Sequence, residues 1–172
     1  ALEVAESLET TVASVNSALQ RARKAVDERL PSRSQQETLR SLGDARIREL
    51  VEAYIGAWAR GDVDALRTLL AEEAVFSMPP WSSWWRGRET VAGFAKEAVE
   101  YCAVSLPVVV SANAQPAVAY YHLDAETGRY LPSANDVFTL DGSVVTDITA
   151  FITPDLFSSF GLPLELACAV RP

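Results

Sequence analysis

Apolar and polar positions follow a helical spacing over the first thirty residues of the chain. The apolar residues Val12, Val15, Leu19, Ala22, Val26 and Leu30 recur at every third or fourth position. This period predicts one amphipathic helix over 12–30, with a shorter helix over 2–8 before it. Thr10 or Thr11 is the expected N-cap of the longer helix. We expect Pro31 to end it, because the residue that precedes a proline avoids the α region.

The helical spacing is lost over 31–41, a polar stretch that we interpret as a linker, and it returns after Gly43-Asp44. A second amphipathic helix follows, whose inward positions are Ile47, Leu50, Val51, Tyr54, Ile55 and Trp58. Gly61-Asp62 ends this helix. The elements expected next are a helix over 63–70, a strand over 74–80 that its two prolines terminate, and a helix over 87–101.

From Ser105 onward the pattern becomes typical of strands. We expect four of them, over 105–114, 116–123, 133–140 and 143–152. The Asp141-Gly142 pair between the last two predicts a tight hairpin, because both residues tolerate the positive φ that such a turn needs. Helices followed by a strand meander predict the α+β class, in which helices pack on one face of a curved antiparallel sheet.

The composition is that of a globular protein with ample material for a packed core. Of the 172 residues, 49% are hydrophobic and 22% are charged. No run approaches the roughly 18 uninterrupted apolar residues that a membrane helix needs. The first ten residues carry three glutamates and lack the basic start and apolar core of a signal peptide. We therefore expect a soluble, cytoplasmic protein without a membrane partner.

The cysteines and the histidine argue against two kinds of site. Cys102 and Cys168 do not have the spacing of metal ligands, and His122 is the only histidine in the sequence. This pattern disfavours a zinc site and Cys/His catalysis. We interpret both cysteines as buried thiols of a reducing compartment, and we expect neither a metal ion nor a cofactor.

Charge is distributed unevenly along the chain. The net charge is −8, but residues 1–40 hold six basic and six acidic side chains, so the remainder carries all of it. Within 10–26 there are three positive charges, Arg21, Arg23 and Lys24, and no acid. A local basic face on an acidic chain is more informative about partners than the total charge.

The first two expected helices fit the second and third helices of a helix-turn-helix, because a three-residue turn joins a short helix to a longer one with a basic C-terminal half. The solvent face of the longer helix is expected to show Ser14, Asn16, Ser17, Gln20, Arg21, Arg23 and Lys24. Asn and Gln can pair with adenine edges and Arg with guanine, while Lys and Arg also neutralise phosphates. An ordinary amphipathic helix with a solvated polar face has the same composition, so composition alone does not choose DNA binding.

The run EVAESLETTVASVNSALQRAR resembles region 4 of extracytoplasmic-function sigma factors, the module that reads the −35 promoter element. The matching residues are Glu3, Val4, Ala5, Leu8, Val12, Val15, Ser17, Leu19, Arg21, Ala22 and Arg23. The resemblance implies that the helix reads promoter DNA and that the full-length protein binds RNA polymerase core. The residues implied to face DNA are Asn16, Ser17, Gln20 and Arg21, with Arg23 and Lys24 nearer the phosphates. Because the match starts in the middle of region 4, we expect a fragment that does not initiate transcription by itself.

Residues 44–165 resemble the SnoaL-like branch of the ketosteroid-isomerase-like superfamily. The resemblance rests on IRELVEAYIGAWARGDVDALRTLLAEEAVFSMPP, then WWRGRETVAGF, then VVTDITAFITPDLFSSFGLP. Similar phrases occur in SnoaL-like domains fused behind sigma region 4, so the two resemblances support each other. Together they imply the end of region 4 over 1–30, a linker over 31–43 and a cone-shaped SnoaL-like pocket domain over 44–172.

The cone of this fold implies a cavity that opens at its wide end. The candidates for its lining are Tyr54, Trp58, Phe76, Met78, Trp81, Trp84, Trp85, Asn113, Gln115, Tyr120, His122, Asn135, Asp147, Thr149 and Phe151. Three of the four tryptophans lie within WSSWW. Their large rings with a polar N–H suit a pocket mouth or an interface, and equally core filling or a lid over the sheet.

One hypothesis makes the cavity catalytic, as in the isomerases and cyclases of the superfamily, which use an Asp base in an apolar pocket. Burial raises the pKa of such an acid, as proton abstraction near neutral pH requires. The nearest candidates are Asp147 and His122. Strand alternation leaves the side of Asp147 open. It points inward if Val145 and Phe151 do, and it faces water if Ile148 and Ile152 point inward.

Three functions are compatible with this fold, and the fold does not decide among them. The favoured one is regulatory: the pocket domain tunes the sigma factor from within the same chain, with a small apolar ligand as a potential signal. The second is a small-molecule isomerase or cyclase, although we expect no catalytic residue set. The third is a dimerisation module, since this fold often forms a homodimer through its sheet.

Overall fold

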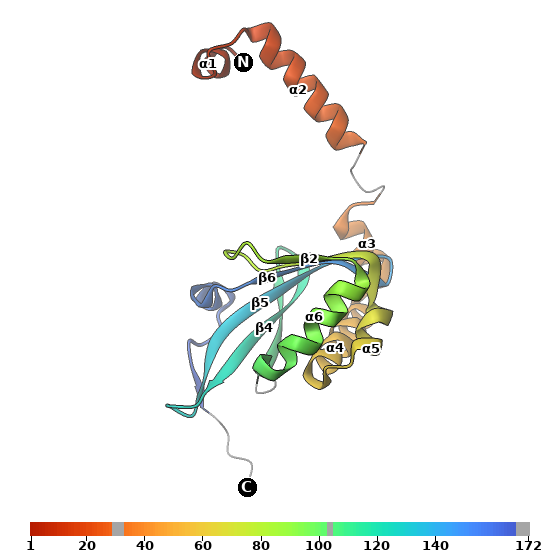
Figure 1. Ribbon diagram of the computed structural model, residues 1–172, viewed down its shortest axis with the longest axis vertical. Helices are drawn as coiled ribbons and strands as arrows, with labels where there is room; N and C mark the ends of the chain where they lie inside the picture. The colour runs from red at the N-terminus through yellow and green to blue at the C-terminus, as the bar shows by residue number, and fades with distance from the viewer. Residues whose placement is uncertain (29–32, 103–104, 168–172) are drawn as a thin grey trace. The chain divides into compact units, whose positions relative to one another are not determined.

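The computed structural model describes residues 1–28, 33–102 and 105–167, and the chain forms two compact units, Ala1–Ser34 and Gln35–Pro172. Figure 1 shows the elements of both. The second unit begins earlier than the expected pocket domain, because the segment before Asp44 belongs to it.

The first unit is a pair of helices, α1 (Leu2–Ser7) and α2 (Val12–Asp27). Thr11 is the N-cap of α2: its Oγ1 accepts a hydrogen bond from the Ser14 backbone N–H at 3.1 Å. A threonine in this place satisfies a backbone donor that the first turn of a helix leaves open. The expected stop at Pro31 lies outside the described residues, and α2 already ends at Asp27.

The expected linker over 31–43 contains a helix, α3 (Gln35–Leu42), which corrects that interpretation. Leu39 is buried, and the Leu140 backbone N–H donates a hydrogen bond to Gln35 Oε1 at 3.1 Å. The segment is amphipathic, but it has only two leucines in eight residues, so polar side chains make up the rest of its inward face and the sequence signal for a helix is weak. Contacts with the rest of the second unit stabilise it instead, as is usual for short helices.

Three further helices lie where the sequence predicts them: α4 (Asp44–Arg60), α5 (Val63–Leu69) and α6 (Arg88–Cys102). Between α4 and α5, Gly61 adopts the left-handed conformation with φ 59°, which favours glycine. Asp62 Oδ1 then accepts a hydrogen bond from the Ala65 backbone N–H at 3.0 Å. One residue therefore ends the first helix and the next residue caps the second.

The helices pack on one curved sheet. Its strands are β1 (Leu70–Ser77), β2 (Trp84–Arg86), β3 (Ser105–Ala112), β4 (Gln115–Asp124), β5 (Arg129–Asp141), β6 (Val144–Phe151) and β7 (Leu166–Ala167). The order is β2-β1-β6-β5-β4-β3, with β7 paired to β5, and all pairs are antiparallel except β1 with β6. Figure 1 shows α4, α5 and α6 on the same side of the sheet. This architecture confirms the predicted α+β class.

Both faces of the sheet bury side chains. On the helix side, the main core includes Tyr54 and Phe138, whose rings meet edge to face with centroids 4.8 Å apart. On the other side, Tyr121 and Phe157 anchor a smaller cluster beneath the 3₁₀ helix η1 (Pro154–Phe160). Because successive residues of a strand point to opposite faces, the phase of each strand decides which core a side chain joins.

Candidate functional site

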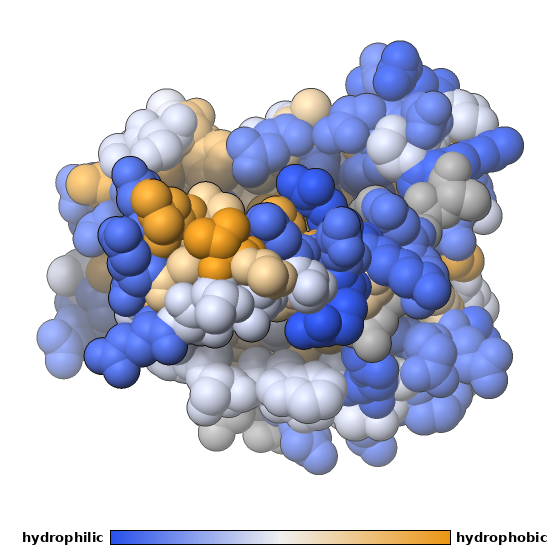
Figure 2. Space-filling model, turned by 90° about the horizontal axis from the view of Figure 1, so that it is seen from above, coloured by the Kyte–Doolittle hydropathy of each residue, from blue (hydrophilic) through white to orange (hydrophobic). Residues whose placement is uncertain are grey.

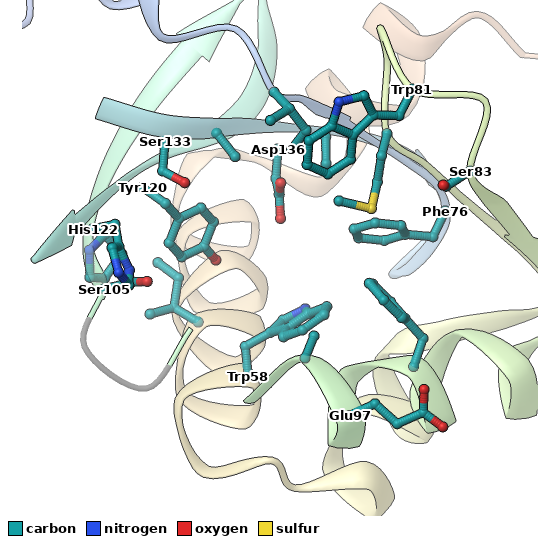
Figure 3. A pocket seen from close by; sticks show the side chains of 18 of the residues that line it. Trp58, Phe76, Trp81, Ser83, Glu97, Ser105, Tyr120, His122, Ser133 and Asp136 are labelled. Atoms are coloured by element: carbon teal, nitrogen blue, oxygen red, sulfur yellow. The ribbon is translucent and has the colours of Figure 1, made fainter. Parts of the chain in front are cut away.

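The helix side of the second unit contains a cavity of about 570 Å³. Helices α4 and α6, the segment from β1 to β2, and strands β3 to β6 contribute to its wall. Figure 3 shows the lining side chains, most of them apolar, around an open space. A volume of this size lies within the range of small-molecule sites, about 300–1,000 Å³.

Aromatic rings form one side of the cavity. Trp85 and Phe94 stack with their centroids 3.9 Å apart and an angle of 20° between their planes. Phe76 lies 5.3 Å from Phe94 and 6.0 Å from Trp58, again between ring centroids. Rings packed in this way restrain one another, so this side of the cavity is preformed.

A carboxylic acid, Asp136 on β5, points into the apolar space (Figure 3). Its side chain is buried, and the Tyr54 hydroxyl donates a hydrogen bond to its Oδ2 at 3.1 Å. Burial raises the pKa of Asp136 to about 7, while the hydrogen bond from Tyr54 acts in the opposite direction. The acid is therefore close to half ionised at neutral pH.

Two tyrosines accompany this acid. The pKa of Tyr54 is raised well above its usual value, first by burial and then by the neighbouring Asp136 and Tyr120. Figure 3 shows the Tyr120 side chain directed into the cavity near Asp136. The three residues come from α4, β4 and β5, so only the packing of a helix on the sheet brings them together.

Two further ionisable side chains, Glu97 on α6 and His122 on β4, line the cavity and are exposed to solvent. Trp81, at 57% exposure, also belongs to the outer part of the lining. Among the described residues that form the wall there is no lysine or arginine. The described parts of the chain also contain no group of three or more His, Cys, Asp or Glu side chains placed to hold a metal ion.

About half of the predicted pocket residues line this cavity. They are Trp58, Phe76, Met78, Trp81, Trp85, Tyr120 and His122. Tyr54 does not line the cavity itself, but its hydroxyl donates a hydrogen bond to the lining residue Asp136. Several other residues that line the cavity are not predicted from the sequence, among them Ile55, Phe94, Glu97, Pro107, Asp136 and Ile152.

Four other predicted residues lie away from the cavity for reasons of strand phase and position. Trp84 alternates with Trp85 on β2 and is 61% exposed. Asn113 lies in the turn after β3 with φ 51°, and Gln115 donates a hydrogen bond from Nε2 to the Phe138 carbonyl at 3.1 Å. Asn135 is buried but adjoins Asp136 in the strand, so it points to the opposite face.

Asp147, our first candidate for a catalytic acid, also points away from the cavity, together with Thr149 and Phe151. The β5–β6 register shifts between Thr139 and Leu140, so β6 carries one extra residue there. This bulge allows Val145 and Ile148 both to be buried on the helix side. Asp147 accepts a hydrogen bond from Thr149 Oγ1 at 3.0 Å, and partial burial raises its pKa. Neither of the two simple alternations considered from the sequence applies to the whole strand.

The sequence contains a signal for Asp136, the cavity acid that was not predicted. Asp136, Phe138 and Leu140 stand at alternate positions of one strand, and all three are buried. A carboxylate that shares the face of two large apolar residues is expected in a core or a cavity. The neighbouring Asn135 carries the same kind of polarity on the other face, so polarity alone does not choose between the two.

The seven predicted DNA-contact residues on α2 are all exposed, namely Ser14, Asn16, Ser17, Gln20, Arg21, Arg23 and Lys24. Several large apolar side chains of α1 and α2 are exposed as well, with Leu2 at 63%, and so is Leu8 directly after α1. Figure 2 shows a face on which apolar side chains, in orange, lie beside hydrophilic ones, in blue. The pair of helices thus has a polar side and an uncovered apolar side. No helix in the described residues is long and apolar enough to cross a membrane.

Solved structures with the same fold resemble the second unit. An NTF2-like protein of unknown function from Burkholderia xenovorans aligns with 69% of this chain and 95% of its own, with 18% identity and a TM-score of 0.54. A protein with a cystatin-like fold from Methylobium petroleophilum aligns with 76% of this chain and 97% of its own, with 17% identity and a TM-score of 0.52. At such identities the likeness shows the fold alone.

The sequence is also similar to the ECF RNA polymerase sigma factor SigG of Mycobacterium tuberculosis, with 31% identity over 169 residues. The aligned part makes up 95% of this chain and 44% of that protein, so the chain spans less than half the length of its relative. The sequence profile of the SnoaL-like domain matches residues 51–151, which include most of the cavity wall. The chain therefore belongs to the SnoaL-like domain family.

Proposed function

We propose that the chain is the C-terminal part of an alternative sigma factor, which directs RNA polymerase to specific promoters, with the SnoaL-like domain as its internal regulator. The observation that carries this proposal is the 31% identity to a sigma factor over 95% of the chain. That similarity includes α1 and α2 as well as the cavity domain, and the SnoaL-like fold alone does not separate a regulator from an enzyme. Promoter DNA and RNA polymerase core are then partners of the full-length protein in the cytoplasm.

In this proposal α2 is the helix that reads the −35 element. Its exposed Asn16, Gln20 and Arg21 are side chains of the types that pair with base edges in the major groove. Arg23 and Lys24 are exposed on the same helix and contribute positive charge toward phosphates, although Lys24 also lies 3.8 Å from the Glu28 carboxylate.

The uncovered apolar side of α1 and α2 supports a place within a larger DNA-binding domain. Leu2, Leu8, Leu19 and Val26 are all exposed, whereas Ala5 is the one buried residue of these helices among the described residues. Exposed apolar patches of this kind mark contact surfaces. We propose that further helices of the DNA-binding domain cover this side in the full-length protein.

A regulatory role for the second unit is supported by its separation and its charge. It is compact by itself, with its own core and cavity, and the −8 net charge falls on the residues beyond position 40. An acidic domain is attracted to basic surfaces such as those that bind DNA. The domain is thus suited to dock on the sigma factor and to respond to a ligand in the cavity.

The regulatory role is tested by deleting residues 35–172 from the full-length protein, because α3 belongs to the second unit. Output from a cognate promoter, measured with a reporter gene at matched protein level, is expected to change when the regulator is removed. Unchanged output at matched level would contradict the role as regulator.

The role of α2 is tested with Arg21→Ala in the full-length protein bound to RNA polymerase. Loss of a base contact is expected to weaken promoter binding by about 1–3 kcal/mol. Arg33→Ala is the matched control, because Arg33 is also exposed but lies outside α2. If both variants bind the promoter as tightly as the unchanged protein, α2 is not the reading helix.

A second candidate function is suggested by Asp136 alone. An acid with a pKa of about 7 in an apolar cavity is suited to take a proton from a carbon beside a carbonyl and return it elsewhere on the same molecule. Turnover of apolar unsaturated ketones that disappears in Asp136→Asn would support an isomerase. Absence of turnover across such ketones would leave the regulatory proposal in place.

A further inference from the structure

We propose that the cavity of the SnoaL-like domain binds a small apolar amine, whose protonated nitrogen pairs with the Asp136 carboxylate while its hydrocarbon part lies against the aromatic wall. The proposal deepens the regulatory function proposed above, because it names the chemical class of the signal. It depends on the geometry and charge of the cavity, which can be tested without promoter DNA.

The charges around the cavity disfavour an anionic ligand. Its ionisable lining residues are Asp136, Glu97 and His122, and the described wall contains no lysine or arginine to pair with an anion. A carboxylate or phosphate in this space would lie near the buried Asp136 without a lysine or arginine to pair with it, which is unfavourable. The ligand is therefore neutral or cationic.

The free hydrogen-bonding capacity of Asp136 favours a cation over a neutral molecule. Within the described residues, Tyr54 alone donates a hydrogen bond to this carboxyl, and it uses Oδ2. The other oxygen remains available on the side of the cavity, where Figure 3 shows the carboxyl end of the side chain. A protonated amine would supply a charge-assisted hydrogen bond there, stronger than the bond from a neutral hydroxyl.

The wall and the mouth of the cavity fit the rest of such a ligand. Trp58, Phe76, Trp85 and Phe94 form a packed aromatic surface, against which the hydrocarbon part of a ligand can be buried. The exposed Glu97 adds negative charge to the outer part of the lining and would draw a cation toward the opening. Apolar bulk and positive charge are therefore recognised by different parts of one site.

Binding of a protonated amine is coupled to the loss of the proton from Asp136. The groups that face it are the neutral hydroxyl of Tyr54 from α4, Tyr120 from β4 and the methyl side chain of Ala150 from β6, with His122 and Glu97 farther out. Because burial raises the pKa of Asp136 to about 7, amine binding near neutral pH must displace a proton from part of the molecules. A neutral ligand displaces none.

The test compares three probes of the same shape, tryptamine, tryptophol and indoleacetate, which are cationic, neutral and anionic. Binding to the 172-residue chain is measured by isothermal titration calorimetry in buffers of different ionisation enthalpy. We expect tryptamine to bind at least about tenfold more tightly than tryptophol, with indoleacetate weakest. Tryptamine alone is expected to release protons near pH 7, and its affinity is expected to rise between pH 6 and 8.

Asp136→Asn is expected to remove the preference for the amine, whereas Asp147→Asn, the matched change of a half-buried acid on the opposite face of the sheet, is expected to keep it. Equal or tighter binding of tryptophol or indoleacetate, or no tryptamine binding at millimolar concentration, would overturn the proposal. If Asp136→Asn does not fold, the proposal is tested by proton release from the unchanged protein when tryptamine binds near pH 7, and absence of that release contradicts it. The deletion assay on promoter output is independent, so the amine site can fail while the regulatory function stands.

Discussion

Replacing Asp136 by asparagine changes one group whose ionisation is strongly perturbed by folding. The folded protein holds this acid buried with a pKa of about 7, whereas the ordinary value is 3.8. Between these two pH values the folded state keeps a proton that the unfolded state releases. Stability therefore falls as the pH rises from about 4 to about 7, and it levels off above the higher value.

The size of this effect follows from the same two values. The difference between 3.8 and about 7 is about three pH units, and each unit corresponds to about 1.4 kcal/mol. The ionised Asp136 thus lowers the free energy of unfolding by about 4 kcal/mol above pH 7 in the absence of a ligand. Asparagine has nearly the same shape, can accept the hydrogen bond from Tyr54 and does not ionise, so Asp136→Asn is expected to be more stable by up to that amount.

The assay is urea unfolding of the 172-residue chain, followed by tryptophan fluorescence at pH 4 and pH 8. We expect Asp136→Asn to match the unchanged protein at pH 4 and to exceed it by about 4 kcal/mol at pH 8. Asp155→Asn, an exposed aspartate of η1, is the control and is expected to show no such difference between the two pH values. A gain in stability that is equal at both pH values, or a loss at pH 8, would refute the account of Asp136.

Three further predictions use the same unfolding assay or a measurement of mass. Leu39→Ala is expected to lower the free energy of unfolding by about 2–3 kcal/mol, because α3 is packed on the second unit; a change below about 0.5 kcal/mol would restore the linker interpretation. Trp85→Ala is expected to cost more than 2 kcal/mol and to weaken tryptamine binding through loss of the stack on Phe94, whereas the exposed Trp84→Ala changes neither. The predicted homodimer is tested by light scattering, in which the mass of a single chain at all accessible concentrations would exclude it.

Much of the local structure is contained in the sequence. The three- and four-residue spacing of apolar side chains predicts α2, α4 and α6, and the Gly61-Asp62 pair predicts the break between α4 and α5. The Asp141-Gly142 pair predicts the hairpin between β5 and β6, where Gly142 has φ 54°. These signals are local because backbone preference and amphipathic spacing act over a few residues, and together they are sufficient for the α+β class.

Other features depend on residues that are distant in the chain. α3 is short and has only two apolar residues, and its packing against α4 and the sheet stabilises it as a helix. A bulge in β6 turns Asp147 away from the cavity, and strand phase places Asp136 inside it, beside a tyrosine that precedes it by 82 residues. The sequence determines which residue types are available for a site, whereas register and helix packing decide which of them meet, because a strand that slips by one residue exchanges its two faces.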